Sequence, residues 1–178
     1  QSLGSKVVFD TANINQYMAA TFDSNSNKVV IVYADGDNSN RGTAIVGTVS
    51  GSSISFGTAV AYNTSSSIFP DVTFDTNSNK VVIAYRDAGN SSYKYSEGHG
   101  IVGTVSGTNI SFGSVASFGN VGASFTNSAF DSTNNKVVIV YKNNVDNSGS
   151  YAVVATVSGT NVSFGTPVRF TTADTTQF

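Results

Sequence analysis

An internal repeat restricts the possible folds of this chain more than any other feature of its sequence. One block of twelve residues occurs three times, with ten of the twelve positions matching the first copy each time, at residues 22–33, 74–85 and 130–141. A second block always follows it, at residues 48–57, 104–113 and 156–165. In repeat proteins each unit is one small group of strands or helices that buries its apolar surface against its neighbours. We therefore expect a stack of similar units.

The repeats divide the sequence into three units and the opening of a fourth. Their boundaries are residues 3–55, 56–111, 112–163 and 164–178. The step from Phe22 to Phe74 is 52 residues and the step from Phe74 to Phe130 is 56, because the second unit carries a longer loop at 86–100. Since the last segment repeats the start of the sequence, we expect the chain to be cut from a longer array.

Each unit is predicted to contain four short strands and no helix. In the second unit the first two strands are expected at 59–62 and 69–74, and in the first unit the last two are expected at 29–33 and 43–49. Residues 29–33 are all apolar, which is typical of a strand covered on both faces. The Asp-Ser-Asn-Ser-Asn stretch before them has the composition of a hairpin turn.

Four strands in about 50 residues, with a central strand buried on both faces, are typical of a β-propeller blade. The predicted fold is therefore an all-β, propeller-like repeat of three four-stranded blades of 52–56 residues and the start of a fourth. Propellers close with about 4–8 blades, so a ring needs further blades or further copies. The alternative fold is an open stacked array or fibre, in which each repeat contacts only its neighbours.

Composition excludes several kinds of partner and cofactor. The chain has no Cys and one His, so it cannot form a thiolate or multi-histidine metal site. Nine Lys and Arg against eleven Asp and Glu give a net charge of −2, with no basic cluster for nucleic acid or acidic lipid. No apolar run is long enough to span a bilayer. We expect no cofactor, no nucleic acid and no membrane insertion.

Sequence motifs for catalysis are also missing, and we predict that the chain is not an enzyme. Asp23, Asp75 and Asp131 recur at the opening of each hairpin, where a carboxylate commonly accepts the amides of its own turn. The Gly-x-Ser-x-Gly motif of serine hydrolases does not occur, and no partner for His99 as a general base is evident from the sequence. The three aspartates are thus interpreted as structural turn residues.

The loops between the third and fourth strands differ between the copies, whereas the strands beside them do not. Functional residues gather on loops that a rigid scaffold holds, and aromatic rings beside polar groups can bind a sugar or a protein edge. The candidate ligand-binding residues are Arg41, Arg86, Asp87, Tyr93, Lys94, Tyr95, Glu97, His99 and Tyr151.

The loop of the first copy contains a possible start of a calcium site. Asp35 and Asp37 place oxygen ligands at alternate positions, as in a calcium-binding loop. The other two copies lose this alternation, and no downstream Glu supplies a bidentate ligand. A turn-forming loop is the alternative interpretation.

Three sequence segments of the repeat resemble those of a known group of proteins. They are Asn-Lys-Val-Val-Ile-Val-Tyr at 27–33, Ala-Ile-Val-Gly-Thr-Val-Ser-Gly at 44–51 and Ile-Ser-Phe-Gly-Thr at 54–58. They are similar to a repeat of large structural proteins of marine phages, cyanophage tail-fibre-like proteins among them, and of surface proteins of marine bacteria. The resemblance implies an extracellular or virion-surface location and a role in attachment or scaffolding. It offers no catalytic motif, and the second copy departs from it at 93–100.

Two functional hypotheses follow from these observations. In the first, the chain is an attachment module whose variable loop face binds a cell-surface glycan or protein. In the second, it is a structural repeat that assembles into a fibre or filament through blade faces and strand edges, with itself or with further repeats of a longer chain. Exposed strand edges at 3–9 and 168–170 would then form the joints.

Overall fold

The structure is a computed structural model that describes residues 4–11, 14–89, 96–119 and 122–171. In chain order, its elements are β1 (Ile14–Asp23), β2 (Lys28–Asp35), the short 3-10 turn η1 (Gly36–Asn38), β3 (Arg41–Ser50), β4 (Ser53–Phe56), β5 (Val60–Asp75), β6 (Lys80–Asp87), β7 (Glu97–Ser106), β8 (Asn109–Phe112), β9 (Ala116–Gly119), β10 (Ser124–Asp131), β11 (Lys136–Lys142), β12 (Ser150–Ser158), β13 (Asn161–Phe164) and β14 (Val168–Arg169). The prediction of an all-β chain is confirmed.

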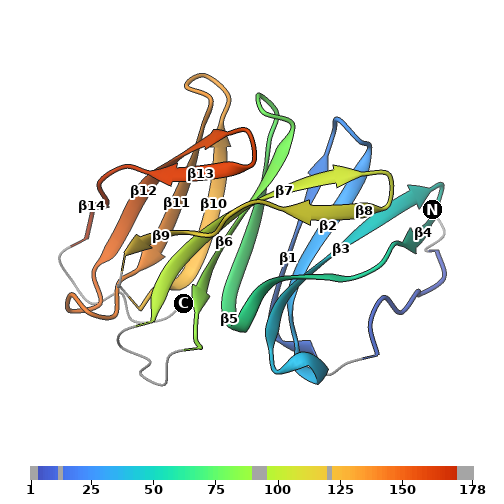
Figure 1. Cartoon of the computed structure of the whole chain (residues 1–178), viewed down its shortest axis with the longest axis horizontal. Coiled ribbons are helices and arrows are strands. Elements are labelled where there is room, and N and C mark those ends of the chain that lie inside the picture. Colours follow the sequence, from blue (N-terminus) through green and yellow to red (C-terminus); the bar gives the residue numbers. More distant parts are fainter. Residues whose placement is uncertain (1–3, 12–13, 90–95, 120–121, 172–178) are drawn as a thin grey trace.

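The strands form two antiparallel sheets. The larger sheet has the order β1-β2-β3-β5-β6-β7-β8, with β4 also on β3 and β9 also on β7. The smaller sheet has the order β10-β11-β12-β13, with β14 also on β12. Figure 1 shows that the long strands lie in three groups side by side, with the green strands β5 and β6 between the blue and orange groups.

The long strand β5 joins two of these groups. Its first part pairs with β3, where Val60 lies opposite Ala44, and its second part pairs with β6, where Asp75 lies opposite Lys80. We call β1–β4 with the first part of β5 layer 1. The rest of β5 with β6–β9 is layer 2, and β10–β14 is layer 3.

The strand pairing places one predicted strand in the layer before the one expected. Residues 59–62 were expected to open the second unit, but Ala61 pairs with Thr43 in layer 1. β9 and β14 pair in the same way with β7 and β12, the third long strands of their own layers. The fourth strand of each layer therefore consists of two pieces, which lie on either side of the repeated Phe-Gly pair at 56–57, 112–113 and 164–165. A sequence period has no fixed starting point, so pattern alone could not show this grouping.

The hairpins before β2, β6 and β11 are built alike. The Asp23 carboxylate accepts the backbone N–H groups of Asn25 and Ser26 at 2.9 and 3.0 Å, and Asn27 takes a positive φ of 55°. The same two bonds form at Asp75 and at Asp131. In each copy the aspartate thus has the turn role that its position predicted.

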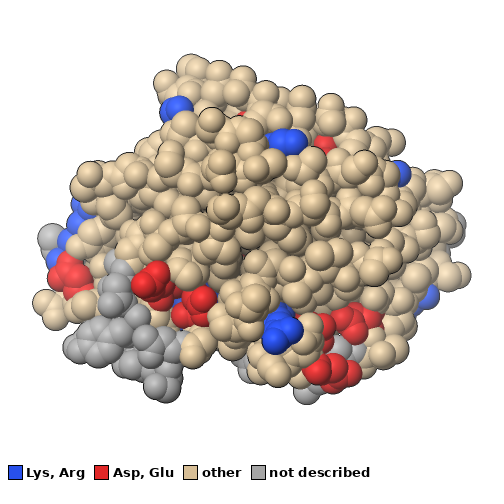
Figure 2. Space-filling view, in the orientation of Figure 1, with Lys and Arg blue, Asp and Glu red and all other residues tan. Residues whose placement is uncertain are grey.

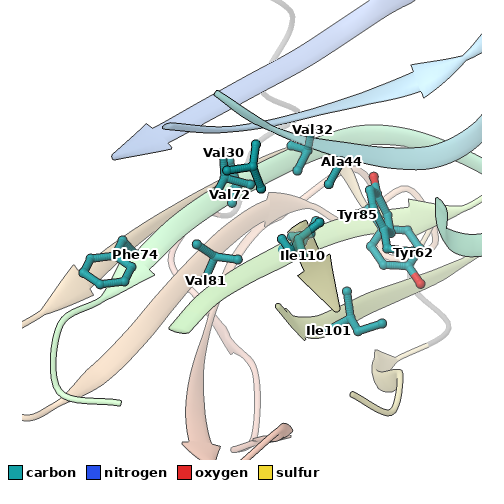
Figure 3. Packing of buried hydrophobic residues seen from close by; sticks show 12 residues of the cluster. Val30, Val32, Ala44, Tyr62, Val72, Phe74, Val81, Tyr85, Ile101 and Ile110 are labelled. Carbon is teal, nitrogen blue, oxygen red and sulfur yellow. The ribbon is translucent and has the colours of Figure 1, made fainter. Parts of the chain in front are cut away.

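The core consists of two apolar clusters, one on each side of layer 2. β6 is completely buried from Val81 to Tyr85, and alternate side chains face opposite clusters because neighbouring residues of a strand point to opposite faces. Figure 3 shows the cluster between layers 1 and 2, where Val30 and Val32 lie near Val72 of β5. Fully burying one such side chain contributes about 1.5–3 kcal/mol.

The expectation of a central strand covered on both faces holds only for layer 2. In β2, Val30 and Val32 are buried, whereas Val29 and Ile31 are partly exposed. In β11, Val137 and Ile139 are buried, whereas Val138 and Val140 are partly exposed. The sequences of the three strands are nearly the same, so the difference arises from the neighbouring layer, which only β6 has on both sides.

Candidate functional site

The main polar cluster of the described residues lies where β6 ends and β7 begins. The antiparallel register places Asp87 opposite Glu97 and Tyr85 opposite His99, so all four side chains share one face of layer 2. Figure 2 shows Asp and Glu side chains at several places along the lower margin of the molecule, the margin at which β6 ends in Figure 1. Ser65, from the start of β5 in layer 1, reaches the same cluster.

The His99 ring lies between two carboxylates. Its Nε2 is 2.8 Å from Glu97 Oε2, and its Nδ1 is 3.5 Å from Asp87 Oδ2. Asp87 Oδ1 accepts bonds from Ser65 Oγ at 2.6 Å and from the Gly89 N–H at 2.8 Å. The Tyr85 ring packs edge-on against the imidazole at 5.6 Å. These contacts hold the imidazole in one orientation at the margin of the core.

The hydrogen bond with His99 has the largest effect on the pKa of the Glu97 carboxyl. It holds the pKa of the Glu97 carboxyl below its ordinary value. Burial, the second-largest effect, acts to raise that pKa, and a bond from Ser117 acts to lower it. Glu97 is therefore ionised at neutral pH while half of its side chain stays exposed. An ionised, exposed carboxylate beside an imidazole is an acceptor for the hydroxyl groups of a ligand.

The arrangement does not form a nucleophile and its base. The Ser65 hydroxyl is bonded to Asp87 and to Asn63 Oδ1, whereas a serine hydrolase requires the hydroxyl to bond with the imidazole. In the part of the chain that the structure describes, no group of three or more His, Cys, Asp or Glu side chains has an arrangement that holds a metal ion.

The possible calcium residues form a turn. Asp35 Oδ1 accepts the N–H groups of Asp37 at 3.1 Å and of Asn38 at 3.2 Å, which caps η1. Ser39 and Asn40 then take positive φ values of 57° each. The loop thus has the structure that the second interpretation, a turn-forming loop, predicted.

Arg86 is not part of the loop surface, contrary to the prediction. Its side chain is fully buried between layers 2 and 3, where Nη1 donates to Ser124 Oγ at 3.0 Å and the guanidinium lies 5.0 Å from the centre of the Phe69 ring. The matching position of the first copy, Ala34, is also buried. The repeated block ends at Tyr85, but β6 continues to Asp87 and so includes Arg86.

The other candidate residues are spread along the same edge. Arg41 Nε donates to the Thr64 carbonyl at 3.1 Å in layer 1. In layer 3, Tyr151 donates to Asp146, which also pairs with Arg169 at 3.1 Å. Tyr93, Lys94 and Tyr95 lie outside the described residues. The structure thus brings Asp87, Glu97 and His99 together and leaves Arg41 and Tyr151 in neighbouring layers.

A second feature, which the sequence patterns did not reveal, is an aromatic contact that joins successive layers. Tyr62 of layer 1 packs against Tyr85 and Phe112 of layer 2 at ring distances of 5.1 and 5.9 Å. Phe118 of layer 2 packs against Tyr141 and Phe164 of layer 3 at 5.1 and 5.3 Å. We call the single ring the plug and the pair of rings the socket.

A glycine lies beside each plug strand and permits close approach of the next layer. A Cβ added at Gly57 would lie 1.9 Å from the Thr108 carbonyl oxygen, and one added at Gly113 would lie 1.7 Å from the Thr160 carbonyl oxygen. Both oxygens belong to the turn before the socket's second ring. The repeated Phe-Gly pair is therefore part of the interface between layers.

No family model, curated protein or solved structure matches this chain. Within the described residues, no helix has the length and apolar character that crossing a membrane requires.

Proposed function

We propose that the chain is a non-catalytic attachment module of an extracellular or virion-surface protein. Its stacked layers act as a rigid support, and the edge that carries Asp87, Glu97 and His99 binds a cell-surface glycan or protein. The observation that carries the proposal is the Asp87–His99–Glu97 cluster, in which fixed side chains leave an ionised carboxylate half exposed. Binding sites commonly combine a rigid scaffold with a few oriented polar groups.

The two edges of the layers differ in a way that supports this assignment. At the hairpin edge each copy has the same Asp and Lys, and the aspartates are occupied by their own turns. At the opposite edge the copies differ in length and in charged residues. An edge that varies while its support is constant is suited to recognition.

We further propose that the layers are blades of a propeller. The first strands of successive layers lie against one another: Thr73 of β5 donates to the Ser128 carbonyl of β10 at 3.1 Å, and Ser128 Oγ donates to Asp71 at 2.6 Å. The rings of Tyr17, Phe69 and Phe125 follow one another across these strands. In a propeller the first strand of each blade lies near the central axis. An open stack of layers is the alternative arrangement.

A structural role is the second candidate function. It is favoured by the plug and socket contact, which has the same form between layers 1 and 2 and between layers 2 and 3. A contact that repeats along the chain is suited to extension by further repeats.

The attachment proposal is tested by binding of the full chain to an array of bacterial surface polysaccharides. We expect binding to at least one polysaccharide, and we expect Glu97→Gln to weaken it about tenfold, since a hydrogen bond to a charged group contributes about 1.5–3 kcal/mol. The matched control is Lys136→Gln, which removes one charge at the opposite edge and should leave binding unchanged. Binding to no polysaccharide, or equal loss in both variants, would contradict the proposal.

A further inference from the structure

The outward face of layer 3 has the composition of an internal face, but no layer formed by the described residues lies against it. Val154 is 44% exposed, whereas its counterparts in the first two copies, Val46 and Val102, are completely buried. Val138 and Val140 of β11 lie on the same face and are partly exposed. Val46 is covered by layer 2 and Val102 is covered by layer 3. The outward face of layer 3 therefore matches two faces that are each covered by the following layer of the same chain.

The end of the described chain also presents an unused plug. Phe170 follows β14 at the position that Tyr62 and Phe118 hold in layers 1 and 2, and it is 60% exposed where each of those rings is 5% exposed. Gly165 matches Gly113, but a Cβ added to Gly165 would meet only the Val154 carbonyl oxygen of its own layer, at 3.8 Å. Layer 3 therefore carries every part of the contact except the next socket.

The outward face of layer 1 carries the other half of the contact. Met18 and Phe22 are exposed there, whereas the matching face of β5 in layer 2, which carries Phe74, is covered by layer 1. Tyr33 and Phe56 form a socket at this face, and the Phe9 ring fills it at 5.4 Å from each ring. Phe9 thus occupies, within its own chain, the place of a plug.

We propose that two copies of this chain associate head to tail, with the outward face of layer 3 of one copy on the outward face of layer 1 of the next, and that Phe170 replaces Phe9 in the Tyr33–Phe56 socket. The inference rests on the second candidate function and goes beyond it. It names the partner surface, the plug and the segment that blocks the socket.

The plug within the chain lies outside any strand, whereas Tyr62 and Phe118 lie in β5 and β9, although Gly4 approaches the Ser52 carbonyl oxygen as closely as Gly113 approaches Thr160. Residues 4–8 form no strand and leave Val7 and Val8 exposed, although Tyr33 Oη donates to Asp10 at 2.7 Å. Phe170, by contrast, follows a strand paired with β12, and its N–H donates to the Ser150 carbonyl at 3.0 Å. Exchange of plugs would also bury Val154, so the contact between two copies covers apolar surface that Phe9 cannot cover.

An interface between two different surfaces of the same chain leaves one free surface at each end of a dimer. Such contacts generate rings if the rotation closes and open filaments if it does not. The segment around Phe9 therefore controls assembly, because it must leave the socket before the next copy enters.

The test measures the association of the full chain by sedimentation velocity over a range of concentrations. Phe9→Ala, which empties the socket, should lower the apparent dissociation constant at least about tenfold if Phe9 fills the socket more than about nine tenths of the time. Val154→Asp should abolish association in the wild-type and Phe9→Ala backgrounds. The matched control is Val145→Asp, because Val145 is 37% exposed but lies in the loop before β12.

Orientation is tested by mixing two variants that are each defective on one face. Both variants carry Phe9→Ala, so that the socket is empty. One adds Val154→Asp and lacks the layer 3 face, and the other adds Phe22→Asp and lacks the layer 1 face. Each alone should be monomeric, and a mixture should form dimers that stop at two copies. Monomeric Phe9→Ala protein, or a mixture that stays monomeric, would overturn the inference. Polysaccharide binding by the same monomeric variants separates this failure from failure of the attachment proposal.

Discussion

Replacing Gly113 by alanine tests the close contact between layers 2 and 3. The new Cβ would lie 1.7 Å from the Thr160 carbonyl oxygen, whereas real Cβ contacts essentially never fall below 3.0 Å. The two layers must therefore separate locally by about 1.3 Å. Gly113 does not have a positive φ, so the alanine adds no backbone strain of its own.

The expected loss of stability for Gly113→Ala is about 1–3 kcal/mol, the usual range for overpacking of a core. In a chain of this length that loss lowers the melting temperature by roughly 2–12 °C. The assay is thermal and urea unfolding followed by circular dichroism in dilute solution. Gly165→Ala is the control, because its Cβ would have 3.8 Å of clearance, and it should keep or slightly raise the stability. Equal stabilities of the two variants would refute the interface.

Three further predictions concern turns, the buried arginine and pH. Asp75→Ala should cost about 1–2 kcal/mol in urea unfolding, because two backbone amides of the hairpin lose their acceptor; an unchanged urea midpoint would contradict that role. Arg86→Ala should cost about 2–5 kcal/mol without changing polysaccharide binding, because it removes a fully buried side chain together with its hydrogen bond to Ser124 and its contact with the Phe69 ring; Arg41→Ala, at the partly exposed edge, should stay within about 0.5 kcal/mol. Burial raises the pKa of Tyr141 from 10.0 to about 12, so the folded chain holds a proton that the unfolded chain loses, and stability should fall as the pH rises from 10 to 12; absorbance titration at 295 nm checks this, and tyrosines that all ionise near pH 10 before unfolding would contradict it.

Much of the architecture follows from local patterns. The all-β class and the hairpins at Asp23, Asp75 and Asp131 could be predicted, because turn composition acts within a few residues. The apolar run at 29–33 was predicted to be covered on both faces, yet only the matching run at 81–85 is, because only that strand has a layer on each side. The arrangement of the layers as blades remains a proposal.

Other features depend on contacts between distant residues, and the patterns did not show them. Val60 and Ala61 pair with β3 of the layer before them, as the short strands β9 and β14 pair with β7 and β12 in the later copies. Arg86 is charged and was assigned to a loop, yet it is buried where Phe69 and Ser124 receive it. The plug at Tyr62 is one aromatic residue in a short strand, and only the next layer gives it a partner.

The candidate site was predicted in part. Asp87, Glu97 and His99 were assigned to one variable loop, and the register of β6 and β7 brings them together. Their hydrogen bonds depend on the side-chain geometry of two strands and on Ser65 from another layer, which a linear pattern does not contain.

Successive layers pack through one repeated aromatic contact. The most direct measurement is the detection of nuclear Overhauser effects between ring protons in a chain with labelled Phe and Tyr. We expect cross-peaks between Tyr62 and Phe112 and between Phe118 and Phe164, whose ring centres lie 5.9 and 5.3 Å apart. Assigned spectra in which both pairs lack cross-peaks would show that the layers do not stack in this way.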